Sequence, residues 1–133
     1  MSVTIAYRDM TDKEYKESQA GFTEHGLEFG NPPEKTERYG FVATDGKAFV
    51  GCSSGLAQNT SKGYQKYFYL SDLFVKKGYR KNRYGEKLLK RLEEKVKALG
   101  IRYIWTWTAD YEAASFYRKH GYNIFVEFED WYP

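Results

Sequence analysis

The chain contains a single cysteine, Cys52, and therefore cannot form an internal disulfide. This cysteine usage fits a reducing compartment, and the apolar stretch around Cys52 indicates a small buried residue rather than a nucleophile. No apolar run is long enough to span a membrane, and the N-terminal stretch MSVTIAYRDM lacks the apolar centre of a signal peptide. We therefore expect a soluble, cytoplasmic protein without a membrane partner.

The chain also lacks a large excess of charge of either sign. It carries 21 basic and 18 acidic residues, a formal net charge of +3. So small an excess provides no overall attraction to nucleic acid, which is therefore not an expected partner. The basic residues are concentrated, because eight of them and one acid lie within residues 76–91. This segment is expected to attract an anion.

The length of 133 residues allows one domain with a hydrophobic core, so we expect a single domain over residues 1–133. The hydrophobic fraction of 41% and the aromatic fraction of 19% exclude a disordered chain. Together these values favour a single-domain α/β or α+β protein.

The most informative stretch is residues 67–99. Residues 67–75 have the apolar, β-rich character of a buried strand, and residues 84–99 repeat leucine and valine at helical spacing. Between them lies a basic turn. The first amides of a helix have no partners within it and sit at the positive end of its dipole, so this junction predicts a phosphate site. The alternative is an ordinary solvated loop before an amphipathic helix.

The remaining elements follow from local signals. Thr11 and Glu14 form a capping box, which predicts a helix from about Asp12 with a thin apolar face, ended by Asn31-Pro32-Pro33. Further strands are predicted at Val3–Tyr7, Tyr39–Thr44, Lys47–Ala57, Ile101–Thr108 and Asn123–Trp131. A hairpin is predicted at Asp45-Gly46, a loop at Gln58–Gln65 and a helix at Tyr111–His120. The strands at 67–75 and 101–108 enclose a helix, so they should be parallel neighbours.

Two motifs, at residues 80–85 and at residues 110–122, together resemble the GNAT family of N-acetyltransferases. Arg80-Lys81-Asn82-Arg83-Tyr84-Gly85 is similar to the family's pyrophosphate loop, although Arg83 stands where the first glycine is expected and would add charge there. Residues 110–122 resemble the family's later helix, with Asp110 in place of its asparagine and Tyr117 at its tyrosine.

The resemblance implies a mixed, mostly antiparallel sheet with a central splayed parallel strand pair and flanking helices. We expect the family's final strand to be absent, and therefore either a shortened form or a homodimer in which a second subunit covers the sheet edge. It also implies direct transfer of an acetyl group from acetyl-CoA, without a metal, to a primary amine of a small molecule or peptide.

The site residues carry over from the same resemblance. It implies that the backbone of Leu73, Phe74 and Val75 holds the pantetheine arm. The diphosphate would be held by Arg80, Lys81, Asn82, Arg83, Tyr84, Gly85 and Glu86, and the cofactor would also meet Asp110 and Tyr117. Leu73 N–H is the expected oxyanion donor, Tyr117 the acid for the thiolate, and Asp72 the base. Rivals for the base are Glu24, His25, Glu28 and His120, although an ordinary surface histidine is the favoured interpretation of His25 and of His120.

Two other functions stay open. Arg83 and Asp110 depart from the family pattern, which would fit a degenerate module that binds coenzyme A without catalysis. A small nucleic-acid-binding domain is disfavoured by the modest net charge. The acceptor is not determined, although a cationic amine would suit aromatic residues and acids, namely Tyr15, Phe22, Trp105, Trp107 and Tyr111 with Glu24, Glu28, Asp72 and Asp110.

Overall fold

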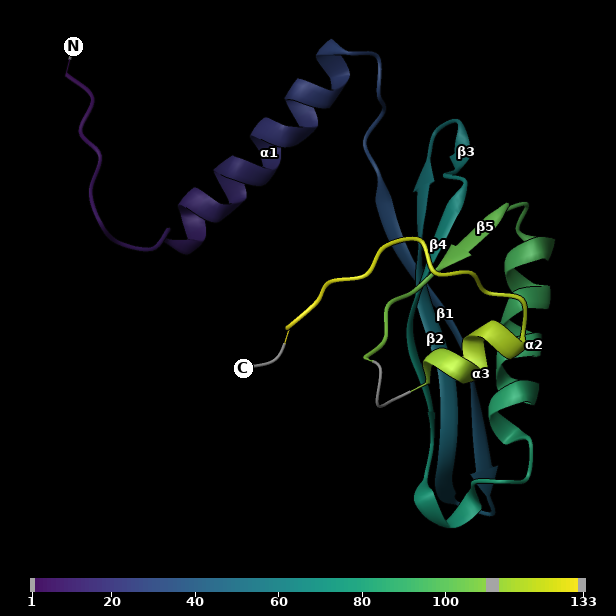
Figure 1. Ribbon diagram of the computed structural model, residues 1–133. Helices are drawn as coiled ribbons and strands as arrows, with labels where there is room; N and C mark the ends of the chain where they lie inside the picture. The colour runs from purple at the N-terminus through teal and green to yellow at the C-terminus, as the bar shows by residue number, and fades with distance from the viewer. Residues whose placement is uncertain (1, 110–112, 132–133) are drawn as a thin grey trace.

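The computed structural model describes residues 2–109 and 113–131. In chain order the elements are α1 (Asp12–Glu28), β1 (Lys35–Asp45), β2 (Ala48–Thr60), β3 (Gly63–Tyr64), β4 (Tyr67–Val75), the 3-10 turn η1 (Lys77–Tyr79), α2 (Tyr84–Ala98), β5 (Tyr103–Trp105) and α3 (Ala114–Lys119). Figure 1 shows a mixed sheet with helices beside it, which confirms the predicted fold class.

The sheet has the order β1-β2-β4-β5, with β3 paired to β2. Its β1–β2 and β2–β4 pairs are antiparallel, whereas β4 and β5 are parallel, as the β4-α2-β5 pattern predicts. The first hairpin turns at Gly46-Lys47, one residue later than predicted, because Asp45 still pairs with Ala48. Gly46 has a φ of 58°, a conformation that glycine adopts without steric cost.

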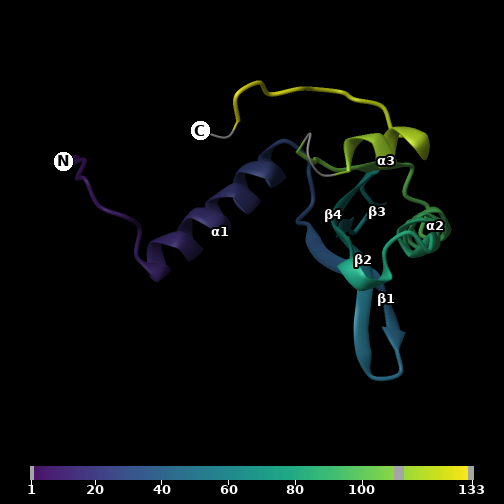
Figure 2. The same ribbon diagram turned by 60° about the horizontal axis from the view of Figure 1, so that its bottom comes forward.

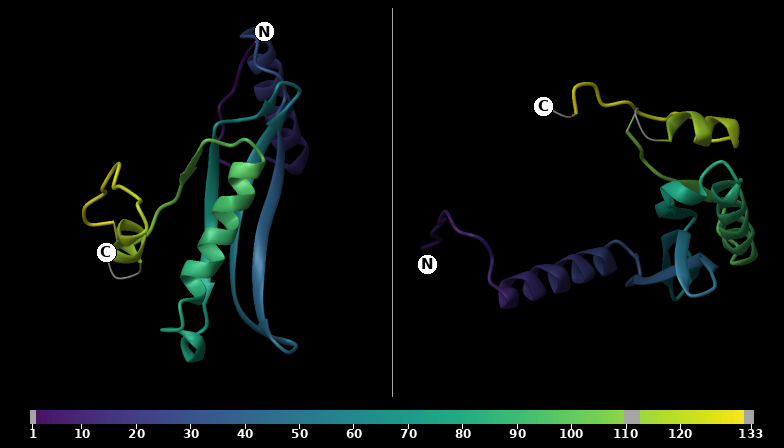
Figure 3. Two further views of the ribbon diagram at one scale, coloured as in Figure 1. Left: turned by 90° about the vertical axis from the view of Figure 1, so that its right-hand side faces the viewer. Right: turned by 90° about the horizontal axis from the view of Figure 1, so that it is seen from below.

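Helix α2 covers one face of the sheet (Figure 3). It buries Leu88, Leu89, Leu92 and Val96, the residues whose helical spacing predicts such a face. Leu89, Leu92 and Val96 join Phe68 and Leu70 of β4 in the core. Burial of each large side chain contributes about 1.5–3 kcal/mol, so this contact fixes α2 on the sheet.

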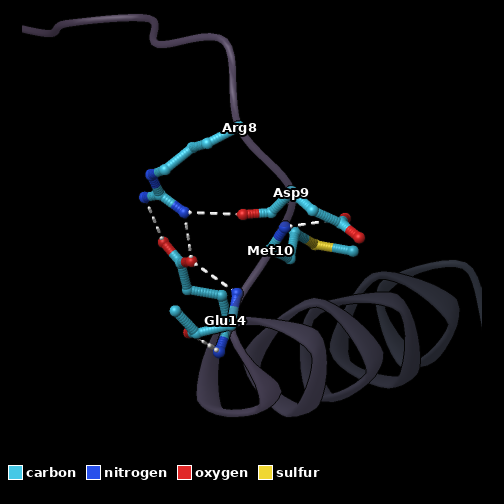
Figure 4. A network of polar contacts seen from close by, with 5 residues as sticks. Arg8, Asp9, Met10 and Glu14 are labelled. Carbon is cyan, nitrogen blue, oxygen red and sulfur yellow. Dashed lines mark hydrogen bonds and ion pairs between the residues drawn. The ribbon is translucent and has the colours of Figure 1, made fainter.

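Helix α1 stands apart from the sheet (Figures 1 and 2) and buries none of its residues. Its N-terminus is nevertheless well defined, because Thr11 and Glu14 form the predicted capping box. Arg8 adds an ion pair at 2.8 Å from its Nη1 to Glu14 Oε1 (Figure 4). The hydrogen bonds from Arg8 and then from Thr11 lower the pKa of Glu14 to about 2. Local contacts therefore determine where α1 begins.

Four strand or loop predictions differ from the structure. Residues 3–7 and 123–131 are not strands: their backbones have no ladder partner, and alternation alone does not supply one. The predicted loop Gln58–Gln65 is instead the end of β2 and the short β3, since Thr60 pairs with Gly63. The strand predicted at 101–108 is reduced to Tyr103–Trp105 because the chain leaves β4 after Trp105.

The outer edge of β5 has no paired strand among the described residues 2–109 and 113–131, because the strand predicted at residues 123–131 does not form there. The start of the helix predicted at Tyr111–His120 falls on residues outside those ranges, and Gly121, with a φ of 90°, follows its end. Within the same part of the chain, no helix has the length and apolar character needed to cross a membrane.

Candidate active site

A gap opens between β4 and β5 where their pairing stops. The pairing covers Tyr67–Tyr69 and Tyr103–Trp105, after which the Thr106 hydroxyl donates to the Leu70 carbonyl at 2.8 Å. Strand β4 continues to Val75 along β2. Lys76 N–H donates to the Val50 carbonyl at 2.8 Å, so alternation turns the N–H groups of Leu73 and Val75 away from β2, toward the gap.

A β-bulge at Ser71 determines which β4 side chains share a face. Ser54 pairs with Asp72 and Gly55 with Leu70, which leaves Ser71 as the extra residue. Beyond the bulge, Leu73 packs against the core, whereas the side chain of Asp72 is 57% exposed. Asp72 accepts a hydrogen bond from the Ser71 hydroxyl at 2.7 Å and lies 3.6 Å from Arg38 Nη1.

The loop before α2 leaves its amides open. Lys81 and Arg83 have φ values of 69° and 62°, so the chain turns sharply twice within this loop. Asn82 Nδ2 stabilises the turn by donating to the carbonyls of Tyr79 and Arg80 at 3.1 and 3.2 Å. Arg83 occupies the N-cap of α2 without a side-chain capping bond. Among the residues that the structure describes, the backbone N–H groups of residues 81–86 have no hydrogen-bond acceptor.

A cavity of about 300 Å³ lies over these amides. Its walls are Val75 of β4, the residues Tyr79, Arg80, Lys81, Arg83, Tyr84, Gly85 and Glu86, and Phe116, Lys119 and His120 at the end of α3. Four of these side chains are cationic and one is an acid. That acid, Glu86, accepts from Lys90 at 2.9 Å, which lowers its pKa. The cavity thus combines free amides, a helix N-terminus and excess positive charge, which is the environment of a phosphate site.

Tyr117 is beside the cavity rather than in its wall. Its ring packs edge-on against Phe116 and Tyr122, with centroid separations of 5.5 and 5.4 Å. Tyr122 donates its hydroxyl to Glu93 Oε2 at 2.9 Å and its N–H to the Tyr117 carbonyl at 2.9 Å, which ties the end of α3 to α2. Burial and then the Glu93 bond raise the pKa of Tyr122.

The structure therefore gathers most of the predicted cofactor residues around one gap and loop. Phe74 was predicted to contribute its backbone, which lies between Leu73 and Val75 on β4, and its half-exposed side chain stacks on Phe49 with centroids 6.4 Å apart. Asp110 lies outside the described residues. The rival bases Glu24, His25 and Glu28 are on α1, away from the cavity. The wall residue Tyr79 was not predicted, whereas Phe116 and Lys119 belong to the second motif and His120 was considered only as a possible base.

Comparison with known proteins now identifies the family. Residues 5–122 match the family model described as the acetyltransferase (GNAT) family. The chain belongs to the GNAT family. No curated protein matches the sequence significantly. The family assignment confirms the resemblance and makes this chain an acyl-CoA-dependent acetyltransferase.

Solved GNAT structures share the fold. An acetyltransferase from Bacillus cereus is 21% identical with a TM-score of 0.74, over 90% of this chain and 83% of the other. A predicted acetyltransferase with acetyl-CoA from Clostridium acetobutylicum is 13% identical with a TM-score of 0.56, over 94% and 77%. An aminoglycoside acetyltransferase from an uncultured soil metagenomic sample, in complex with sisomicin, is 16% identical with a TM-score of 0.58, over 92% and 75%. The TM-scores show a shared fold, and at these low identities the likeness shows the fold alone.

Proposed function

We propose that this GNAT protein transfers an acetyl group from acetyl-CoA to a primary amine of a small molecule or peptide, by direct attack through a tetrahedral intermediate. The observation that carries the proposal is the set of unpaired amides at residues 81–86, surrounded by cations and placed beside the open edge of β4. This arrangement binds a diphosphate and directs an extended thiol arm along Leu73–Val75.

Different residues of the chain would bind different parts of acetyl-CoA. The loop from Arg80 to Glu86 holds the diphosphate, and the backbone of Leu73–Val75 holds the pantetheine arm. Leu73 N–H, which alternation turns toward the gap, donates to the thioester oxygen as negative charge builds on it. Arg83, where the family has glycine, adds a guanidinium to the phosphate site.

The chemical step needs a base and an acid. Asp72 removes a proton from the acceptor ammonium, directly or through water. The neutral amine nitrogen then attacks the carbonyl carbon and forms the C–N bond of the tetrahedral intermediate. The C–S bond breaks as the carbonyl forms again, and the nitrogen releases its second proton to water to give the neutral amide. Tyr117 donates a proton or a hydrogen bond to the departing thiolate. A thiolate is already a fair leaving group, so Tyr117→Phe should slow turnover by about ten- to a thousandfold without abolishing it.

Two further expectations belong to this proposal. The aminoglycoside acetyltransferases with the same fold support a small-molecule acceptor.

The outer edge of β5, unpaired within residues 2–109 and 113–131, supports a homodimer in which a second copy covers that edge. Sedimentation equilibrium would test the dimer, and a monomer at all concentrations would contradict it.

The alternative is a coenzyme A-binding module without catalysis, which the Arg83 replacement favours. The two functions separate in one assay, which measures amine-dependent thiol release from acetyl-CoA with a panel of primary amines. The proposed enzyme releases thiol only when an amine is present and loses rate in Tyr117→Phe and Asp72→Asn. Thermal stabilisation by about 2.7 kcal/mol at a hundredfold excess of acetyl-CoA over Kd, without thiol release for any amine, would favour the binding module instead.

A further inference from the structure

A second cavity, of about 220 Å³, lies between β1 and α2. Its walls are residues 41–43 of β1 and, from α2, Tyr84, Lys87, Leu88 and Arg91. Tyr84 also lines the cavity over the free amides, and it is the only described residue that the two cavities share. The second cavity is therefore a neighbour of the proposed phosphate site and is separate from it.

Apolar and aromatic side chains form much of this cavity. Leu88 is only 6% exposed, and Phe41 packs against the hydrophobic core. Tyr84 adds a second ring to the wall. An apolar cavity of about 150 Å³ is large enough to bind benzene. A cavity of about 220 Å³ therefore has room for one aromatic ring that carries a small substituent.

Two cations are held over the rings of the same cavity. Arg91 Cζ lies 5.0 Å from the centroid of Phe41, and Lys87 Nζ lies 5.6 Å from the centroid of Tyr84. These cation–π contacts keep both charges at the wall instead of leaving them free in solvent. A guanidinium that is stacked by its flat face still presents its N–H groups at its edge. Arg91 can therefore stay on Phe41 and donate hydrogen bonds to a ligand.

Both cations are without an anionic partner. In the part of the chain that the structure describes, neither Lys87 nor Arg91 has a hydrogen-bond acceptor or a carboxylate within ion-pair distance. Lys90, on the same helix, differs because it pairs with Glu86 at 2.9 Å. The described walls of the second cavity contain no acid. The charge of this cavity is thus complementary to an anion, and its apolar walls are complementary to a ring.

We propose that the cavity between β1 and α2 is a second ligand site, which binds a small aromatic carboxylate such as benzoate. The ring of the ligand packs against Phe41 and Leu88, and its carboxylate accepts hydrogen bonds from Arg91 and Lys87. A guanidinium edge matches the geometry of a carboxylate, which favours this anion for the site. Because the two cavities share only Tyr84, this ligand and acetyl-CoA bind at the same time.

Calorimetric titration of the full chain with benzoate, benzamide and acetate tests the two features of the ligand. Benzamide keeps the ring without the charge, and acetate keeps the charge without the ring. We expect benzoate to bind about tenfold more tightly than either, as two exposed ion pairs or one partly buried ring would provide. Arg91→Gln should remove the preference for benzoate over benzamide, and Arg91→Lys should retain part of it. Lys97→Gln, which removes a cation from the last turn of α2, is the matched control and should leave the preference unchanged.

Amide NMR of the same titration locates the bound benzoate. We expect the largest shifts at residues 41–43 and 87–91, and the same shifts when acetyl-CoA is present at saturation. Displacement of benzoate by acetyl-CoA would overturn the inference, because the benzoate would then occupy the diphosphate cavity. Equal affinities for benzoate and benzamide would also overturn it, as would a preference for benzoate that survives Arg91→Gln.

Discussion

The two long helices are stabilised in opposite ways. Helix α1, of 17 residues, has a complete capping box and no buried residue. Helix α2, of 15 residues, has no side-chain cap and buries Leu88, Leu89, Leu92 and Val96. The core fixes α2 so firmly that its first amides need no capping side chain, and they remain available to a ligand. Capping and ligand binding thus compete for the same amides: α1 uses its amides for capping, and we propose that α2 uses its amides for ligand binding.

The largest expected effect comes from a substitution in the core contact that stabilises α2. Leu92→Ala removes a side chain that is 0% exposed and should cost about 3 kcal/mol in the free energy of unfolding. Phe22→Ala, on α1 and 69% exposed, should change it by less than about 0.5 kcal/mol. Urea denaturation followed by circular dichroism measures both. A comparable loss in Phe22→Ala would mean that α1 packs against the rest of the molecule.

A second change tests the free N-terminus of α2. Arg83→Gln removes one cation from the cavity and should weaken acetyl-CoA binding by about ten- to a hundredfold, since charged hydrogen bonds contribute about 1.5–3 kcal/mol. Lys97→Gln removes the same charge from the other end of α2 and is the matched control. Isothermal titration at two salt concentrations measures both affinities. Equal losses of acetyl-CoA affinity in the two variants would show a general electrostatic attraction to the protein rather than a binding site at the loop.

The corresponding change in α1 has a smaller effect. Thr11→Ala deletes the cap that Glu14 N–H uses at 3.1 Å and should destabilise the first turn by about 1 kcal/mol. Hydrogen exchange should accelerate at residues 12–16 and stay unchanged in α2. The free energy of global unfolding should hardly change, because α1 contributes no buried residue. Faster exchange in α2 would contradict this independence.

Lowering the pH produces the smallest effect. Arg8 first, and then Thr11, lower the Glu14 pKa from 4.5 to about 2, so the carboxylate stabilises the cap fully above pH 4.5. This contribution is lost as the pH falls toward about 2, when Glu14 becomes protonated in the folded helix. An NMR titration of the Glu14 carboxyl carbon measures the midpoint. Arg8→Gln should raise it, and an unchanged midpoint would contradict the assigned cause.

The sequence alone predicts those features whose causes are local. Neighbouring residues alone determine three such features: the capping box at Thr11, the apolar spacing of α2 and the β4-α2-β5 pattern. Residues 3–7 and 123–131 alternate like strands and are not strands, because a ladder needs a partner at a position that periodicity does not specify. The end of β5 after Trp105 likewise depends on where β4 diverges.

The candidate site was predictable to the same degree. Charge and helix position indicate the loop at Arg80–Glu86, and a family motif adds Tyr117. The wall formed by Phe116, Lys119 and His120 depends on the position of α3. The hydrogen bond between Tyr122 and Glu93, which are distant in the sequence, holds α3 in that position. The bulge at Ser71 also needs the register with β2. Neither long-range contact leaves a local signal in the sequence.

The most direct test of the phosphate site is an amide NMR titration of the full chain with acetyl-CoA. The free N–H groups at residues 81–86 should gain acceptors, so we expect their resonances to show the largest shifts, followed by Leu73 and Val75, with α1 unchanged. Saturable binding that leaves residues 81–86 unshifted would contradict the account, because the diphosphate would then be held elsewhere.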